Sequence, residues 1–150
     1  MSHPESESGT IVSVQLCPGY RKPMLVVEEA MAIENLGLQG DKHALRDSSR
    51  QVLLIENETL EKLKLEPGEV KENITTTGIR LMTLASKARL HIGSDVVLEI
   101  TKPCSPCSRM EEIRPGLLKE IGGKRGMLAR VLRGGKIRRG DTIYHLDRPA

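Results

Sequence analysis

Two cysteines three positions apart, Cys104 and Cys107, are the residues of this sequence best suited to chemistry. Each directly follows a proline, and the pair separates an apolar alternating segment from a short segment with helical character. A pair with this spacing can bind a metal ion, cycle between dithiol and disulfide, or contain one reactive thiolate. These alternatives require different neighbours elsewhere in the chain.

A structural zinc site needs four ligands, commonly two C-x-x-C pairs or one pair with two histidines close in sequence. The other candidate ligands, Cys17, His43, His91 and His145, are scattered singly along the chain. His91 falls in a strand pattern, where we expect an ordinary sheet residue. We therefore expect no zinc.

A thioredoxin-like centre needs a strand, the cysteine pair and a long helix within a βαβ pattern. Here the helical segment is short and is broken at Pro115, so a general dithiol oxidoreductase fits poorly. The third alternative is one nucleophilic thiolate at Cys107, just before a helix start, where backbone N–H groups lower the pKa of a thiol. A further alternative is that both cysteines are small apolar fillers. The two prolines favour a site instead, because they restrict the backbone where filling space would not require it.

The composition narrows the classes of protein. The 150 residues have the length of one ordinary domain and contain no Trp or Phe and only Tyr20 and Tyr144, so the core must be aliphatic and a base-stacking surface is not expected. Net charge is +3 overall, but residues 124–150 contain eight basic and two acidic residues. This C-terminal segment is a candidate for facing an anion.

The sequence contains no apolar run long enough to cross a bilayer. Residues 1–9 are polar and acidic, unlike a signal peptide, and we expect them to be a disordered tail before a single domain over residues 10–150. We expect a cytoplasmic protein that makes no contact with a membrane. In that reducing compartment a C-x-x-C pair is more often catalytic or metal-binding than a structural disulfide.

The hydrophobic pattern predicts many short strands and few helices. We expect strands over residues 10–17, 23–33, 50–56, 73–79, 88–93 and 96–102 and three more within 127–146. We expect short helices over residues 57–65, capped by Asn57, and over 108–113 and 116–121. Glycine-rich turns between such strands favour a mainly β fold, a closed or nearly closed barrel of mostly antiparallel strands with a few short helices.

Six motifs occur in a fixed order: "GLQGDKHA", "RQVLLIE", "PGEVKENITTTGI", "IGSDVVLEIT", "PCSPC" and "RGMLARVLRGGKIRRGD". Together they resemble the MOSC domain family, the C-terminal domain family of molybdenum cofactor sulfurases, which also occurs as small stand-alone proteins. The resemblance covers residues 10–144 and implies a β-rich, barrel-like domain. It also implies one characteristic cysteine, which matches Cys107.

The resemblance implies two roles for Cys107. It carries sulfur as a persulfide received from a pyridoxal-phosphate-dependent cysteine desulfurase, or it ligates molybdenum when the molybdopterin cofactor is bound. The sulfur acceptor would then be the molybdenum cofactor or a molybdoenzyme. Cys104 departs from the family pattern; it either resolves a Cys107 persulfide into a disulfide or has no role.

Several further residues are candidates for binding the cofactor. Arg125 precedes a glycine in a predicted loop, where it can reach the phosphate of a pterin, while the arginines around it form a solvated face. Asp41 and His43 in "GDKHA" form a turn or a pocket wall. Arg50 can face the same pocket or solvent, and the family match at Glu72 and Asn73 weighs against a simple turn.

Three functions follow as hypotheses. The first is a sulfur carrier or cofactor-binding domain that works with a desulfurase and is not a self-sufficient enzyme. The second, from the enzyme class, is a small molybdenum-dependent reductase of N-hydroxylated compounds. The third is a basic nucleic-acid-binding barrel, which the small net charge and the missing aromatics disfavour.

Overall fold

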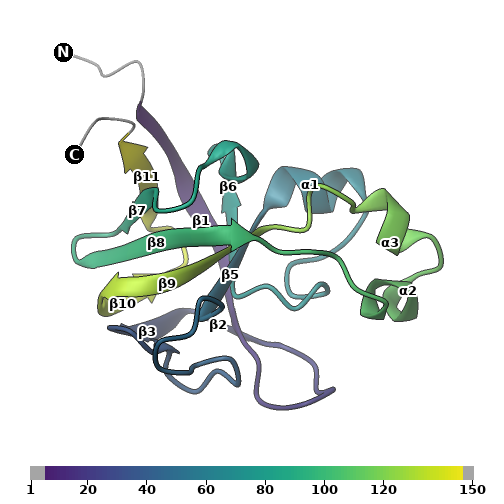
Figure 1. Ribbon diagram of the computed structural model, residues 1–150, viewed down its shortest axis with the longest axis horizontal. Coiled ribbons are helices and arrows are strands. Elements are labelled where there is room, and N and C mark those ends of the chain that lie inside the picture. Colours follow the sequence, from purple (N-terminus) through teal and green to yellow (C-terminus); the bar gives the residue numbers. More distant parts are fainter. Residues whose placement is uncertain (1–5, 147–150) are drawn as a thin grey trace.

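Seven strands close into a barrel in the computed structural model, which describes residues 6–146 (Figure 1). Around the barrel the order is β1, β6, β5, β9, β8, β7, β11, and β11 pairs with β1 to close the ring. Only the β5–β6 pair is parallel among these described strands. The barrel strands are β1 (Ser6–Leu16), β5 (Val52–Glu56), β6 (Ile74–Thr77), β7 (Arg89–Ile92), β8 (Val96–Pro103), β9 (Met127–Arg133) and β11 (Thr142–Leu146).

Four further strands lie outside the ring. β2 (Leu25–Val27) pairs with the end of β1. A second sheet has the order β10 (Gly135–Arg138), β3 (Glu29–Ile33), β4 (Gly37–Leu38). The single strand expected over residues 23–33 is therefore divided at Glu28, because its two halves pair with different partners and the Glu28 carbonyl accepts the Arg139 N–H (3.0 Å).

The α-helices α1 (Asn57–Lys62), α2 (Arg109–Ile113) and α3 (Leu117–Glu120) gather at one side of the molecule, away from β7 and β11 (Figure 1). A short 3₁₀ turn, η1 (Leu81–Thr83), lies between β6 and β7. The predicted fold class, mainly β and barrel-like with a few short helices, is confirmed. The predicted cap was wrong: Glu56 is the N-cap of α1 because β5 runs directly into the helix, and its carboxylate accepts the Met82 N–H (3.2 Å).

Aliphatic side chains fill the barrel, as the composition requires. A second cluster lies beneath the helices and joins them to the loop that precedes β6. The fully buried members of the barrel cluster include Val14, Leu38, Val52, Leu54, Ile74, Leu81, Leu90, Ile92, Leu98, Ile100, Ala129, Ile137 and Ile143. The second cluster contains Ile55, Leu60, Leu65, Val70, Met110, Leu117 and Ile121.

Part of the segment expected to be a disordered tail, residues 1–9, lies in a strand. β1 begins at Ser6, so residues 6–9 form part of a strand, because this segment pairs with β11 and the Glu7 carboxylate forms an ion pair with Arg80 (2.7 Å). Residues 1–5 of the expected tail lie outside the described residues. Within residues 6–146, no helix combines the length and apolar character that crossing a membrane requires.

Candidate functional site

The two cysteines of the C-x-x-C pair have different environments. They lie in the cysteine loop, residues 104–108, which connects β8 to α2. Cys107 is exposed, whereas Cys104 is buried against Leu53 and Leu128. The Cys104 N–H donates to the Gly126 carbonyl (2.9 Å), which continues the pairing of β8 with β9. Cys104 thus packs as the apolar-filler alternative expects, and Cys107 is the accessible thiol.

Cys107 stands two residues before α2, close to the predicted position. The Met110 N–H donates to the Cys107 carbonyl (2.9 Å), and the Met110 side chain is buried beneath the helices. The helix is five residues long and has no side-chain cap. Its packing through Met110 fixes where the cysteine loop ends.

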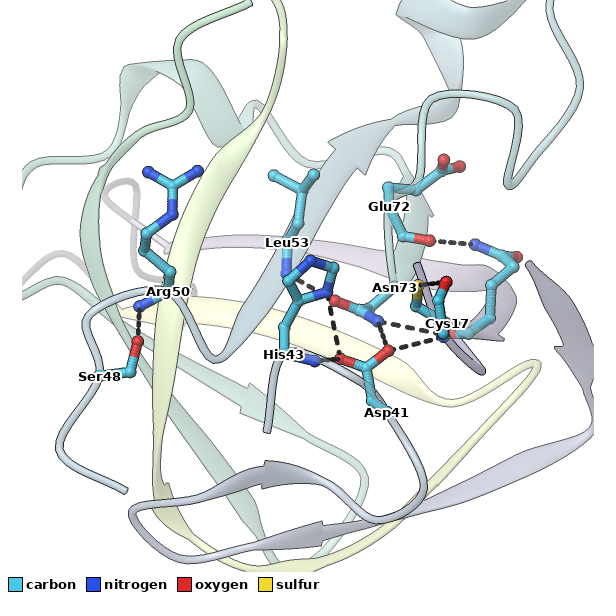
Figure 2. A network of polar contacts seen from close by, with 10 residues as sticks. Cys17, Asp41, His43, Ser48, Arg50, Leu53, Glu72 and Asn73 are labelled. Atoms are coloured by element: carbon cyan, nitrogen blue, oxygen red, sulfur yellow. Dashed lines mark hydrogen bonds and ion pairs between the residues drawn. The ribbon is translucent and has the colours of Figure 1, made fainter. Parts of the chain in front are cut away.

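Asp41 is a buried carboxylate at the centre of a group of hydrogen bonds that we call the Asp41 network: Cys17, Asp41, His43, Leu53 and Asn73 (Figure 2). Of these residues only His43 is exposed. Asp41 Oδ1 accepts the Cys17 N–H (2.7 Å) and the Asn73 side-chain amide (3.0 Å). Asp41 Oδ2 accepts the His43 backbone N–H (3.1 Å) and lies 3.6 Å from His43 Nδ1. The network ties the loop that contains Asp41 to the end of β1.

Asn73 uses its side chain entirely within the protein. Its Oδ1 accepts the Leu53 N–H (3.0 Å), and its Nδ2 donates to Asp41 Oδ1 and to the Gln15 carbonyl (3.2 Å). Its backbone N–H also donates to the Leu53 carbonyl (2.8 Å). Both amide protons and the amide oxygen are therefore engaged, so Asn73 holds the starts of β5 and β6 against the end of β1.

Glu72 is fully buried beside this network. Its Oε2 accepts the Gly68 N–H (2.8 Å) and the Thr75 hydroxyl (2.8 Å), and its carbonyl accepts the Gln15 side-chain amide (3.0 Å). Burial raises the pKa of Glu72, although these hydrogen bonds and the charge of Arg125 act in the opposite direction. Glu72 Oε1 has no hydrogen-bond partner in the part of the chain that the structure describes.

Arg125 is a buried guanidinium with spare donors. Arg125 is 6% exposed, and its Nη2 donates a hydrogen bond to the Val70 carbonyl (2.6 Å). Its Nε and Nη1 have no partner among residues 6–146. Gly126 follows with φ +120°, and a Cβ there would lie 2.4 Å from the Leu54 carbonyl oxygen, so only glycine lets the chain at Arg125 approach β5 this closely. Unsatisfied buried N–H groups are expensive, which makes Arg125 a candidate for binding an anion.

Arg50 contacts neither the Asp41 network nor Arg125 through a hydrogen bond or ion pair within residues 6–146. Its side chain is exposed, and its backbone N–H donates to the Ser48 hydroxyl (3.0 Å). Figure 2 draws Arg50 joined to Ser48 and apart from the dashed contacts of the Asp41 network. The structure thus gathers Asp41, His43 and Asn73, with Glu72 beside them, and leaves Arg50 at the surface.

Sequence reasoning missed the residues that connect these parts. Leu53 bonds Asn73 through its backbone and packs on Cys104 with its side chain, so it joins the Asp41 network to the cysteine loop. Gln15 is fully buried and bonds Glu72 and Thr75. A single amide within the apolar alternation of "IVSVQL" was the available signal for Gln15, whereas no local pattern marks Leu53.

Clusters of conventional metal ligands are missing from this region. Across the described residues 6–146, no three or more His, Cys, Asp and Glu side chains gather where they could hold a metal ion.

The MOSC domain profile matches residues 39–144, which is more than half of the chain. The chain belongs to the MOSC domain family. This match confirms the predicted family and includes Asp41, the cysteine loop and Arg125.

Solved structures of two bacterial proteins have a similar fold. The YuaD protein of Bacillus subtilis has a TM-score of 0.79 at 17% identity, covering 95% of this chain and 98% of that one. YiiM of Geobacillus stearothermophilus has a TM-score of 0.74 at 19% identity, covering 93% of this chain and 76% of that one. At these identities the likeness shows that the MOSC domain barrel is shared.

One curated relative is a protein of Gibberella moniliformis named "Reductase". It is 35% identical over 86 residues, which cover 55% of this chain. The chain spans only 15% of that protein's length, so the match concerns one small part of a much larger molecule.

Proposed function

We propose that this MOSC domain carries sulfur as a persulfide on Cys107 for maturation of the molybdenum cofactor. The observation that supports this most strongly is that Cys107 is exposed while the other two cysteines, Cys17 and Cys104, are buried. A thiol that exchanges sulfur with a partner protein must be reachable from solvent. The family membership supplies the link to molybdenum chemistry.

The transfer needs no oxidant. The Cys107 thiolate attacks the outer sulfur of a donor persulfide, R–S–SH, which forms the Cys107 persulfide and releases the donor thiolate R–S⁻. The donor we propose is a pyridoxal-phosphate-dependent cysteine desulfurase, and the acceptor is the molybdenum cofactor or a molybdoenzyme. The cytoplasm suits this chemistry because thiols stay reduced there.

The residues present also fit the molybdenum cofactor itself. The Cys107 thiol would be its molybdenum ligand, and Nε and Nη1 of Arg125, which have no partner within residues 6–146, would donate hydrogen bonds to its phosphate. When bound, the cofactor supplies a redox-active metal. The side chains of Asp41 and Asn73 form their hydrogen bonds within the protein, so we assign them to positioning the surrounding loops. The His43 side chain is 47% exposed and can contact a ligand.

A second candidate function is a small molybdenum-dependent reductase of N-hydroxylated compounds. The 35% identity with part of a protein named "Reductase" favours it. It requires the complete cofactor and an electron donor, whereas the carrier function requires only the thiol and a sulfur donor.

Intact mass spectrometry after incubation with a cysteine desulfurase and cysteine tests the carrier. We expect an adduct of about 32 Da, one sulfur atom on a cysteine thiol, that is absent from Cys107→Ala. We expect Cys104→Ala, the matched control, to take up sulfur and to change only the lifetime of the adduct.

Equal loss of the adduct in both variants would remove the distinction between the two cysteines. An adduct that persists in Cys107→Ala would contradict the carrier proposal. No adduct in the unmodified protein, together with co-purified molybdenum and pterin, would favour the reductase instead.

A further inference from the structure

Tyr20 lies at the surface with three cationic side chains around its ring. Tyr20 is 63% exposed, and the centroid of its ring lies 4.8 Å from Lys42 Nζ, 4.9 Å from Arg109 Cζ and 5.5 Å from Arg21 Cζ. Arg21 Nε also donates to the Tyr20 hydroxyl (3.2 Å). We call these four residues the Tyr20 patch.

The Tyr20 patch lies between the Asp41 network and the cysteine loop in its contacts. Lys42 stands between Asp41 and His43, and its N–H donates to the Cys17 carbonyl (2.8 Å). Arg109 is the first residue of α2 and follows Cys107 by two positions. The exposed aromatic ring therefore contacts one residue beside the Asp41 network and one beside the reactive thiol.

The charge of this patch is positive. Glu112 forms an ion pair with Arg21 (3.0 Å), with both side chains exposed. Among residues 6–146, neither Lys42 nor Arg109 forms an ion pair with a carboxylate. The hydrogen bonds and charges of Arg21 and Arg109 lower the pKa of Tyr20, as expected for a phenol in a cationic environment.

Its exposure indicates a protein partner. Small-molecule sites are concave and enclose most of their ligand, which a tyrosine that is itself 63% exposed does not do. Tyr and Arg are the residue types most enriched among the energetically dominant residues of protein interfaces. Unpaired cations around such a ring complement an acidic surface.

We propose that the Tyr20 patch is the docking surface for an acidic segment of the protein that delivers sulfur to Cys107. This proposal rests on the proposed carrier function. A protein donor must bring its own persulfide sulfur to the exposed Cys107 thiol, so its docking contact must lie beside that thiol, and Arg109 lies there. The patch selects the donor by charge and orients it.

Two measurements with the source organism's cysteine desulfurase test this proposal. The first is the second-order rate constant for sulfur loading of Cys107 at low ionic strength. The second is the affinity of the desulfurase for Cys107→Ala protein, measured by biolayer interferometry, which reports docking without any sulfur transfer. The test variant is the double charge reversal Lys42→Glu with Arg109→Glu.

Arg133→Glu combined with Lys136→Glu is the control with an equal change in net charge. It also removes the exposed ion pair of Lys136 with Glu29 (3.4 Å), a kind of contact that contributes little to stability. Arg133 pairs with Val97 at the start of β8, whereas the cysteine loop follows the other end of that strand. Thermal unfolding of every variant checks that the fold is retained.

We expect the patch variant to load sulfur at least about tenfold more slowly and to bind at least about tenfold more weakly, with the difference shrinking as salt rises. The control should stay within about twofold of the unmodified protein. Equal binding by the patch and control variants, or no binding of the desulfurase at all, would overturn the docking proposal. Patch-dependent binding without any loading of Cys107 would reject the carrier function and leave the docking surface standing.

Discussion

The Asp41 network and the cysteine loop meet at Leu53, whose backbone bonds Asn73 and whose side chain packs on Cys104, and they differ in how their polar groups are used. In the Asp41 network the carboxylate of Asp41 and the amide of Asn73 bond only to groups of the protein. In the cysteine loop Cys107 is exposed. Arg125, which precedes the glycine that accepts the Cys104 N–H, has two side-chain nitrogens without partners within residues 6–146.

The difference separates two roles that a family motif does not distinguish. Residues of the Asp41 network stabilise the loops and strand ends. Cys107 instead has an exposed thiol, and Arg125 has N–H donors without partners within residues 6–146. Leu53 connects the two roles, since its backbone bonds Asn73 and its side chain supports Cys104. Substitutions in the network should therefore affect stability, and substitutions at the loop should affect reactivity.

Removal of the Asn73 side chain should have the largest effect on stability. Asn73→Ala leaves the Leu53 N–H and one lone pair of Asp41 without partners in a buried site. We expect the free energy of unfolding to fall by about 3 kcal/mol, the combined cost of lost and unsatisfied buried hydrogen bonds. Urea denaturation followed by circular dichroism measures it.

Asn57→Ala is the control of identical chemistry. Asn57 is the first residue of α1 and caps no helix, so we expect a change within about 0.5 kcal/mol. If Asn73→Ala destabilised the protein no more than Asn57→Ala, the assignment of the Asp41 network to the scaffold would be incorrect.

A smaller, pH-dependent effect distinguishes Glu72 from Glu58, two carboxylates with the same kinds of partner. Glu58 Oε2 accepts the Gly78 N–H (2.8 Å) and the Thr77 hydroxyl (2.9 Å) at the surface. Burial acts to raise the pKa of Glu58, but these hydrogen bonds outweigh it and the pKa is lowered. At Glu72 burial dominates and the pKa is raised.

The two glutamates should therefore give opposite pH slopes. The raised pKa of Glu72 means that its contribution to stability is present below its unfolded pKa of about 4.3 and is lost as the pH rises. Glu72→Gln should gain stability relative to the unmodified protein between pH 4 and 8, by no more than about 1.4 kcal/mol per pH unit because one proton is involved. Because the pKa of Glu58 is lowered, its contribution is complete above its unfolded pKa of about 4.3 and is lost as the pH falls below that value. Glu58→Gln should therefore lose relative stability as the pH rises toward about 4.3 and follow the unmodified protein above it.

Urea denaturation of the three proteins at a series of pH values measures both slopes. Parallel pH dependences for the two variants would show that burial does not separate these carboxylates.

Local sequence patterns predicted most elements of the fold but not how distant segments meet. The hydrophobic pattern located the barrel strands, and the glycine-rich turns between them include the one that joins the antiparallel strands β7 and β8. The parallel pairing of β5 with β6 and the closure of the barrel by β1 and β11 depend on contacts between distant segments, which no local pattern encodes.

The candidate site shows the same limit. The position of Cys107 before a short helix follows from "SPCSRMEEI", and the family motif marks Asp41 and Asn73. Their internal hydrogen bonds could not be predicted, because they depend on Cys17 and Leu53, which come from other parts of the barrel. The cations around Tyr20 come from three separate segments and left no signal in the sequence.

Site-resolved alkylation of the native protein tests the central claim, that Cys107 is the working thiol on a closed scaffold, most directly. The protein would be exposed to iodoacetamide for increasing times, quenched and digested, and the modification of each of its three cysteines followed by mass spectrometry. We predict that Cys107 is modified first, and that Cys17 and Cys104 react at least about tenfold more slowly because local opening must expose them. Modification of Cys104 as fast as that of Cys107 would contradict the account.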